Sequence, residues 1–261
     1  MKIYIETDLE GVTGVFQFRQ TRERNTPEYR EAVRLLMGDI AAVAEGLKRG
    51  GATEIFALDS HGGGNHFIPE CMVSGVRYIT GMPRDRELYG LDESFAGVVL
   101  LGYHAMNGTA DGVLHHTQSS KAEAKYWYNE VERGEIYQSA VIAGHFNVPV
   151  ILVTGDEAAC REARATLGED LPTVAVKKGI SRQAAVLLAP SDARAALAEG
   201  AERAMAALPQ RVPFRPAFPV KLRVRSIIPG AATLETPWYS ERECEVRNGL
   251  DIIRGSTGSS S

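Results

Sequence analysis

Strand-like and helical hydrophobic patterns alternate along the first two thirds of the chain. After Thr26-Pro27, a pair typical of a helix start, apolar side chains recur at three- and four-residue spacing up to Gly50. Short apolar runs typical of buried strands occupy residues 2–7, 55–60, 97–103 and 148–154. A right-handed crossover through the helix makes the first two strands parallel. We therefore expect an α/β fold with a mostly parallel sheet and helices on both faces.

The pattern changes beyond about residue 170. Before that point, one further helix is expected to begin at residues 134–138 and another to cover 156–167. Beyond it, we expect a short strand at residues 173–176 and an Ala-rich helix at 191–208. A Pro-rich linker at 213–219 and a half-exposed strand at 221–227 should follow. This pattern predicts an α/β domain over residues 1–170, a smaller α+β lobe over 171–254 and a disordered tail over 255–261.

Polar side chains follow the first three apolar runs at the points where the strands should end. Asp8 and Glu10 follow the first run, His61 the second and His104 the third, while Glu135 lies near an expected helix start. Asp8 and Glu10 should point the same way, because strand side chains alternate with a period of two. The carboxyl ends of parallel strands meet at one edge of a sheet, where ligands bind. A site at this edge is expected.

The chemistry of these side chains predicts a metal centre. Two imidazoles and three carboxylates form a ligand set suited to zinc, with manganese or cobalt as alternatives. Five ligands exceed what one tetrahedral ion uses, so we expect two zinc ions about 3.5–4 Å apart with Asp8 as the bridge.

The sequence resembles the zinc-dependent D-aminopeptidases associated with bacterial dipeptide-transport operons. The matching segments occur in one order, and they include Asp8-Leu9-Glu10-Gly11-Val12-Thr13-Gly14, Asp59-Ser60-His61, Leu101-Gly102-Tyr103-His104-Ala105, Gly112-Val113-Leu114-His115-His116, Gly134-Glu135, residues 148–156 and residues 176–182. The last quarter of the chain matches weakly. The resemblance implies zinc ligands at the five positions named above and a catalytic histidine in the Gly-Val-Leu-His-His segment. It also implies a ring-like homo-oligomer.

Two adjacent histidines compete for that catalytic position. Counting from Gly112-Val113 places the family's histidine at His116, with His115 as the second candidate. Successive side chains of an extended segment face opposite sides, so at most one of the two should enter the site. The chain departs from the family pattern at Glu6-Thr7 and at residues 62–64, where we expect an effect on substrate shape rather than on metal binding.

The other candidate residues have more ordinary interpretations. Asp59 could orient a metal-bound imidazole, although a role as a turn residue is equally compatible with its position. His66 and His145 are expected to be non-ligands. The three cysteines, Cys71, Cys160 and Cys244, are far apart and include no C-x-x-C pair, so neither a zinc ribbon nor a redox motif is indicated.

Composition narrows the class of protein. The 261 residues are 44% hydrophobic and 24% charged, which is ordinary for a globular protein. A formal net charge of −4 and the lack of a basic stretch argue against a nucleic-acid partner. No leader pattern and no run of about 18 apolar residues is present, so we expect a cytoplasmic protein without a membrane partner.

These observations predict metal-dependent hydrolysis of short peptides from the amino end. A metal-activated water would attack the peptide bond, and His116 would stabilise the oxyanion or pass a proton to the leaving amine. A preference for an N-terminal D-amino acid is implied by the resemblance alone. The alternatives are a metal-dependent hydrolase of another amide or phosphoester, and a non-catalytic peptide-binding scaffold. The candidate ligands include no Cys, which disfavours a purely structural zinc site.

Overall fold

The computed structural model describes residues 1–227 and 239–255, which form two sheets and five α-helices. The larger sheet has the order β3-β2-β1-β4-β7-β8-β9. Its strands are β1 (Lys2–Thr7), β2 (Glu54–Asp59), β3 (Val76–Ile79), β4 (Gly97–Tyr103), β7 (Val150–Asp156), β8 (Thr173–Ser181) and β9 (Ala184–Leu187). All pairs in it are parallel except β8 with β9. The expected α/β fold with a mostly parallel sheet is confirmed.

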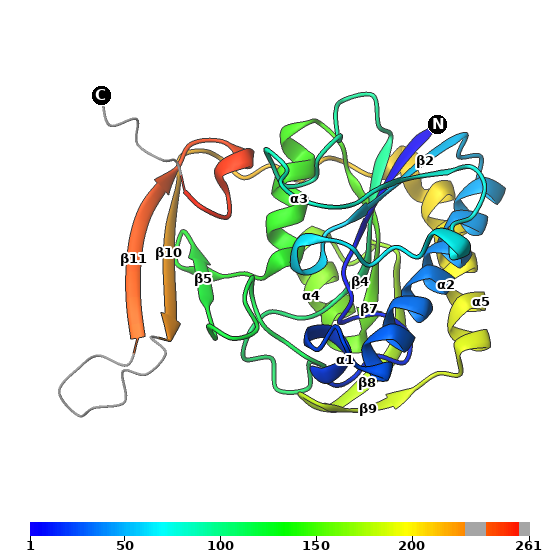
Figure 1. Cartoon of the computed structure of the whole chain (residues 1–261). Coiled ribbons are helices and arrows are strands. Elements are labelled where there is room, and N and C mark those ends of the chain that lie inside the picture. The colour runs from blue at the N-terminus through cyan, green and yellow to red at the C-terminus, as the bar shows by residue number, and fades with distance from the viewer. Residues whose placement is uncertain (228–238, 256–261) are drawn as a thin grey trace.

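The smaller sheet is antiparallel and has the order β11-β10-β5-β6. It combines β5 (Lys125–Tyr128) and β6 (Val131–Glu132) from the middle of the chain with β10 (Val220–Ile227) and β11 (Tyr239–Val246) from its end. Figure 1 shows this sheet on the far side of one helix from the larger sheet. That helix is α3 (Glu135–His145).

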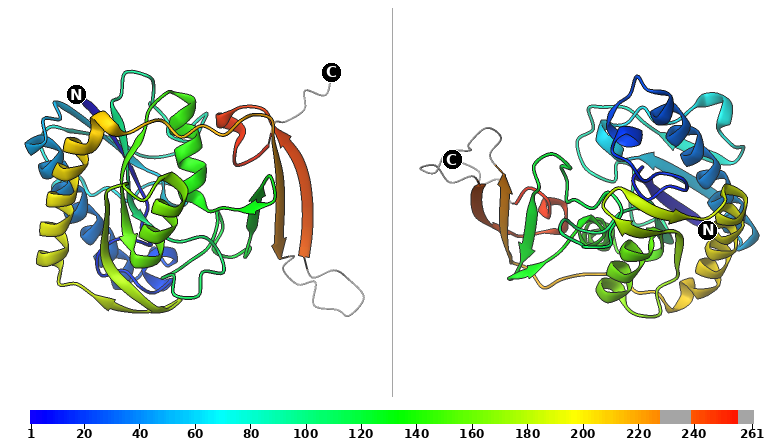
Figure 2. Two further views of the ribbon diagram at one scale, coloured as in Figure 1. Left: turned by 180° about the vertical axis from the view of Figure 1, so that it is seen from behind. Right: turned by 90° about the horizontal axis from the view of Figure 1, so that it is seen from below.

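Helices cover both faces of the larger sheet (Figure 2). The helices are α1 (Arg19–Arg22), α2 (Pro27–Arg49), α3, α4 (Glu157–Leu167) and α5 (Pro190–Ala207). One apolar cluster joins α2 and α5 to one face of the sheet, and a second joins α3 to the opposite face and to the smaller sheet. The Thr26 hydroxyl caps α2 by accepting a hydrogen bond from Tyr29 N at 3.2 Å, as the Thr-Pro pair predicted.

The expected boundary at residue 170 does not separate the two sheets. Strand β8 pairs with β7 after the α4 crossover, and α5 packs against α2 on the same layer. Residues 173–207 therefore complete the larger sheet, because a strand that follows a short crossover returns beside its predecessor. The smaller sheet instead takes β5 and β6 from within residues 1–170. Of the expected tail, residues 256–261 lie outside the described residues.

The helices in the described ranges include none that is both long enough and apolar enough to cross a membrane.

Candidate metal centre

The ends of three neighbouring strands bring the predicted site together. In the sheet register, Thr7 of β1 lies opposite Asp59 of β2 and opposite Leu101 of β4. The residues that follow these strands therefore emerge at one edge. Asp8 N donates to Leu101 O at 2.8 Å, which holds the chain after β1 against β4.

Two glycines allow the close approach of the chain segments after β1 and β4. A Cβ atom on Gly11 would collide with Tyr103 O, and one on Gly102 would collide with Asp8 O. Gly102 also has a positive φ of 76°, which L-residues with side chains rarely adopt. Both positions therefore require glycine, because a side chain would push Asp8 and His104 apart.

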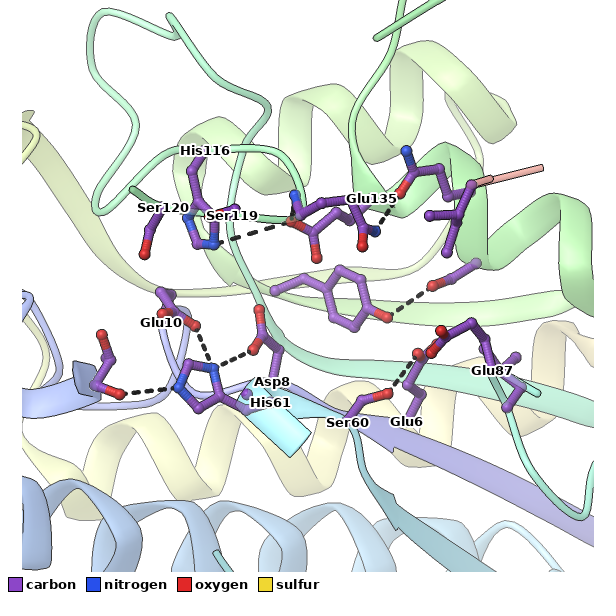
Figure 3. A pocket seen from close by; sticks show the side chains of 18 of the residues that line it. Glu6, Asp8, Glu10, Ser60, His61, Glu87, His116, Ser119, Ser120 and Glu135 are labelled. Carbon is purple, nitrogen blue, oxygen red and sulfur yellow. Dashed lines mark hydrogen bonds and ion pairs between the residues drawn. The ribbon is translucent and has the colours of Figure 1, made fainter. Parts of the chain in front are cut away.

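Asp8 lies between two histidines from different strands. Its Oδ1 atom is 2.9 Å from His61 Nδ1, and its Oδ2 atom is 3.3 Å from His104 Nε2. Glu10 Oε2 is 3.0 Å from His61 Nδ1, and Glu135 Oε1 is 3.4 Å from His104 Nε2. The structure thus brings all five predicted ligands together, and Figure 3 shows Asp8, Glu10, His61 and Glu135 around one cavity.

Main-chain carbonyls fix the orientation of the imidazoles. His61 Nε2 lies 3.0 Å from Thr21 O, and His104 Nδ1 lies 2.9 Å from Ala105 O. A carbonyl oxygen only accepts, so these ring nitrogens carry the proton and donate it. The other nitrogen of each ring faces carboxylates, and with a metal ion bound it would direct its lone pair at the ion in place of a proton. Metal-bound histidines commonly have this arrangement, with the second N–H held by a carbonyl.

The donor atoms fit a bound cation. The buried atoms His104 Nε2 and Glu10 Oε2 have no hydrogen-bond partner among the described residues. Ligand atoms of Asp8, Glu10 and His104 lie within 4.8 Å of one another, as do those of His104, His116 and Glu135. Buried polar atoms without partners are costly, and a metal ion shared between them removes that cost. The nitrogen and oxygen donors suit zinc.

Electrostatics at the site favour a positive charge. Burial disfavours ionised Glu135, yet the nearby His104 outweighs burial and lowers the pKa of Glu135 to about 2. Burial likewise disfavours a charged His104, but Glu135 and Asp8 raise its pKa to about 10. Burial together with the charge of Glu10 raises the pKa of Asp8 to about 6. A metal cation at this place would supply the positive charge that the carboxylates attract.

The two adjacent histidines face different surroundings. His116 is buried, its ring stacks on that of His104 at 3.9 Å, and its Nε2 atom is 4.0 Å from Glu135 Oε1. Its Nδ1 donates to Leu114 O at 2.8 Å. His115 Nδ1 instead accepts a hydrogen bond from Gly108 N at 3.1 Å. His116 lines the cavity, whereas His115 is not among its lining residues.

Asp59 orients a histidine, but not one of the expected ligands. Its Oδ1 atom is 2.7 Å from His66 Nδ1, and both side chains are buried. The ring of His66 lies edge-on to that of His61, with 4.9 Å between centroids. His66 therefore supports the position of His61 from behind. His145 lies at the end of α3, as expected.

A buried lysine holds the loop that carries Glu10. Lys177 Nζ donates to the carbonyls of Glu10, Val12 and Val15 at 2.6, 2.9 and 2.5 Å. Burial lowers its pKa to about 8, against the influence of Asp156 and Asp39. Nothing in the sequence indicates this role of Lys177, because its partners are main-chain atoms more than 160 residues away.

The metal centre borders a cavity of about 410 Å³. Asp8, Glu10, His61, His116 and Glu135 line it, together with hydroxyl and charged side chains from the surrounding loops. This volume lies in the range of small-molecule sites.

Comparison with known proteins identifies the family. A family model described as D-aminopeptidase matches residues 1–240, which is most of the chain. The chain belongs to the D-aminopeptidase family. A D-aminopeptidase from Bacillus subtilis (strain 168) is 33% identical over 263 residues, covering 98% of this chain and 89% of the relative. The resemblance stated from the sequence is confirmed, and so is the expectation of a metal-dependent aminopeptidase.

A solved D-aminopeptidase structure has the same fold. It is described as the Zn-dependent D-aminopeptidase DppA from Bacillus subtilis, a self-compartmentalizing protease. The match has a TM-score of 0.86 and 25% identity, and it covers 97% of this chain and 94% of the other.

Proposed function

We propose that this D-aminopeptidase family member removes the first residue of short peptides with zinc held by Asp8, Glu10, His61, His104 and Glu135. The observation that carries the proposal is the convergence of these five side chains beside one cavity, with two of their buried donor atoms lacking hydrogen-bond partners within the described ranges. The zinc dependence of the solved relative supports the choice of metal.

Two zinc ions per subunit fit this ligand set better than one. Asp8 presents one carboxylate oxygen to His61 and the other to His104, as expected of a bridging ligand. Glu10 lies on the His61 side and Glu135 on the His104 side. Zinc, when bound, supplies a Lewis acid for the scissile carbonyl and a hydroxide nucleophile at neutral pH.

His116 is proposed as the proton-transfer or oxyanion-stabilising group. Its Nδ1–H is committed to Leu114 O, so Nε2 is the nitrogen that faces Glu135 and the cavity. From this position the unprotonated Nε2 can accept a proton from the attacking water and, once protonated, hydrogen-bond the developing oxyanion or deliver that proton to the leaving amine. Burial and the neighbouring His104 lower the pKa of His116, which keeps the ring available as a base.

The substrate is proposed to be a short peptide with an N-terminal D-residue. A cavity of about 410 Å³ is suited to a dipeptide-sized ligand. The handedness is supported by the description of the family and by the curated relative.

A homo-oligomer is proposed from two observations. The solved relative is described as self-compartmentalizing. In this chain, Ile180, Val186, Leu187 and Leu188 of the β8–β9 region are 39–65% exposed, and such an apolar group fits a protein interface. The cytoplasmic location stays a prediction, which cell fractionation tests.

The decisive experiment combines metal analysis with matched D- and L-aminoacyl dipeptides. Purified protein should contain about two zinc ions per chain, and chelation should abolish amino-terminal cleavage until zinc is restored. Faster turnover of the D-dipeptide supports the proposed substrate. Undiminished cleavage by metal-free protein would refute the mechanism. Fully metallated protein that cleaves neither dipeptide would favour a binding scaffold.

A further inference from the structure

Glu6 is a buried carboxyl group beside the metal centre that the proposed reaction does not use. It lies on β1 two residues before Asp8, which follows the end of the strand, so the two side chains are expected on the same side of the chain. The residue is only 4% exposed and lines the cavity. Its Oε1 atom accepts a hydrogen bond from Ser60 Oγ at 3.0 Å, whereas Oε2 is buried and forms no hydrogen bond of normal geometry with the described residues, although the hydroxyl groups of Tyr103 and Ser139 lie near the carboxyl group.

A buried carboxylate oxygen without a donor is costly unless a cationic ligand or another donor completes it. We propose that Glu6 binds the α-ammonium group of the peptide substrate and so fixes which end of the peptide reaches the metal centre. The inference rests on the proposed peptidase function. An aminopeptidase acts beside a free ammonium group, and this carboxyl is the cavity group placed to receive it.

The spacing along β1 agrees with this assignment. Residues two apart on a strand are about 7 Å apart. The nitrogen of an N-terminal residue lies about 2.5 Å from its own carbonyl carbon, and a charge-assisted hydrogen bond adds about 2.8 Å. The scissile carbonyl of a peptide whose ammonium group is bonded to Glu6 can therefore lie about 5 Å from the Glu6 carboxylate, which is compatible with a position next to Asp8.

The charges across the cavity support the same orientation of the peptide, with its ammonium group at Glu6. Figure 3 shows Glu6 and Glu87 on one side of Asp8 and Ser119 and Ser120 on the other. At the Ser120 end, Arg22 also lines the cavity and donates to Ser120 Oγ at 2.9 Å and to Ser120 O at 2.6 Å. A dipeptide with its ammonium at Glu6 directs its carboxylate towards Arg22, whereas the reversed peptide meets like charges at both ends.

Glu87 is less suited to this role than Glu6. It forms an ion pair with Arg254 at 3.3 Å, and its side chain is 41% exposed. Its charge is thus already compensated and screened by water. This makes Glu87 a matched control, because it lines the same end of the cavity.

The test measures binding of an uncleavable probe to the zinc-loaded protein by calorimetry. The probe is the ketomethylene isostere of D-alanyl-D-alanine, and its partner is the same molecule without the amino group. The wild type should bind the amino form at least about tenfold more tightly, the scale of a hydrogen bond to a charged group. In Glu6→Gln this preference should fall below about threefold, with the zinc content unchanged. Glu87→Gln should keep the preference of the wild type for the amino form.

Several outcomes would overturn the proposal. These are an equal affinity of the wild type for both probes, an undiminished preference in Glu6→Gln, and loss of zinc from that variant, which would make Glu6 a ligand. If Glu6→Gln does not fold, Ser60→Ala is measured in its place. Loss of the Ser60 hydroxyl should weaken binding of the probe with the amino group but not binding of the probe without it. Cleavage of D-alanyl-D-alanine is assayed separately, so lack of turnover contradicts the proposed function and leaves the binding result readable.

Discussion

His115 and His116 differ in what their free ring nitrogens face. His116 Nε2 faces Glu135 at the metal centre, while His115 Nδ1 is engaged by Gly108 N. We expect His116→Ala to lower kcat by about 10² or more, the scale for loss of one proton-transfer or oxyanion group, with zinc content unchanged. His115→Ala should have a much smaller effect.

Steady-state kinetics and metal analysis of both variants provide the check. His116 stacks on His104 and lies in a group of potential ligands, so the zinc content of the His116→Ala protein is as informative as its kcat. A larger loss of kcat in His115→Ala would reverse the assignment. Loss of zinc from His116→Ala would make His116 a ligand instead.

At the residue scale, the convergence of most of the predicted ligands could be expected from the sequence, because four of the five follow strand ends. Asp8, His61 and His104 needed only the parallel sheet to bring them together. The contact of Asp59 with His66 was not predictable, because it depends on the glycine-rich turn after His61. The role of Glu6 was missed as well, since its alternation with Asp8 gave no sign of an unpaired buried oxygen.

At the scale of elements, α2 is tied to the loop that follows β1 by a buried carboxyl group. Asp39 Oδ2 accepts a hydrogen bond from Thr13 N at 2.9 Å, and burial raises the pKa of Asp39 to about 6 despite the influence of Thr13 and Arg194. The unfolded chain has the ordinary pKa of about 3.9. Between these values the folded state binds more protons, so this group lowers the free energy of unfolding as pH rises.

Asp39→Asn should remove that dependence while leaving an oxygen to accept from Thr13. The difference in free energy of unfolding, variant minus wild type, should grow by up to about 3 kcal/mol between pH 4 and pH 7. Urea unfolding of both proteins across this range measures it. A difference that stays constant, or that shrinks with rising pH, would contradict the account.

Long elements were predictable and short strands were not. The helix α2 and the strands β1, β4 and β7 have strong periodicity or long apolar runs, and each was expected near its observed bounds. The strands β3, β5 and β9 have only four residues each, too few for a pattern to stand out. The pairing of these short strands depends on contacts that the sequence does not display.

At the scale of the whole molecule, the smaller sheet supports the proposed metal centre through one helix. Helix α3 carries Glu135 at its first residue and packs between the two sheets. The domain boundary expected at residue 170 assumed that neighbours in sequence form a lobe. Strands β5 and β10 pair across more than 90 residues, and composition gives no signal of such a pairing.

The central claim is that four side chains from the segments that follow β1, β2 and β4, and one from the start of α3, hold zinc at one edge of the sheet. Crystals of the zinc-loaded protein, measured at the zinc absorption edge, test it most directly. We expect anomalous density for two ions in contact with Asp8, Glu10, His61, His104 and Glu135, with Asp8 touching both. Density elsewhere, or three or more of these side chains turned away from it, would contradict the account.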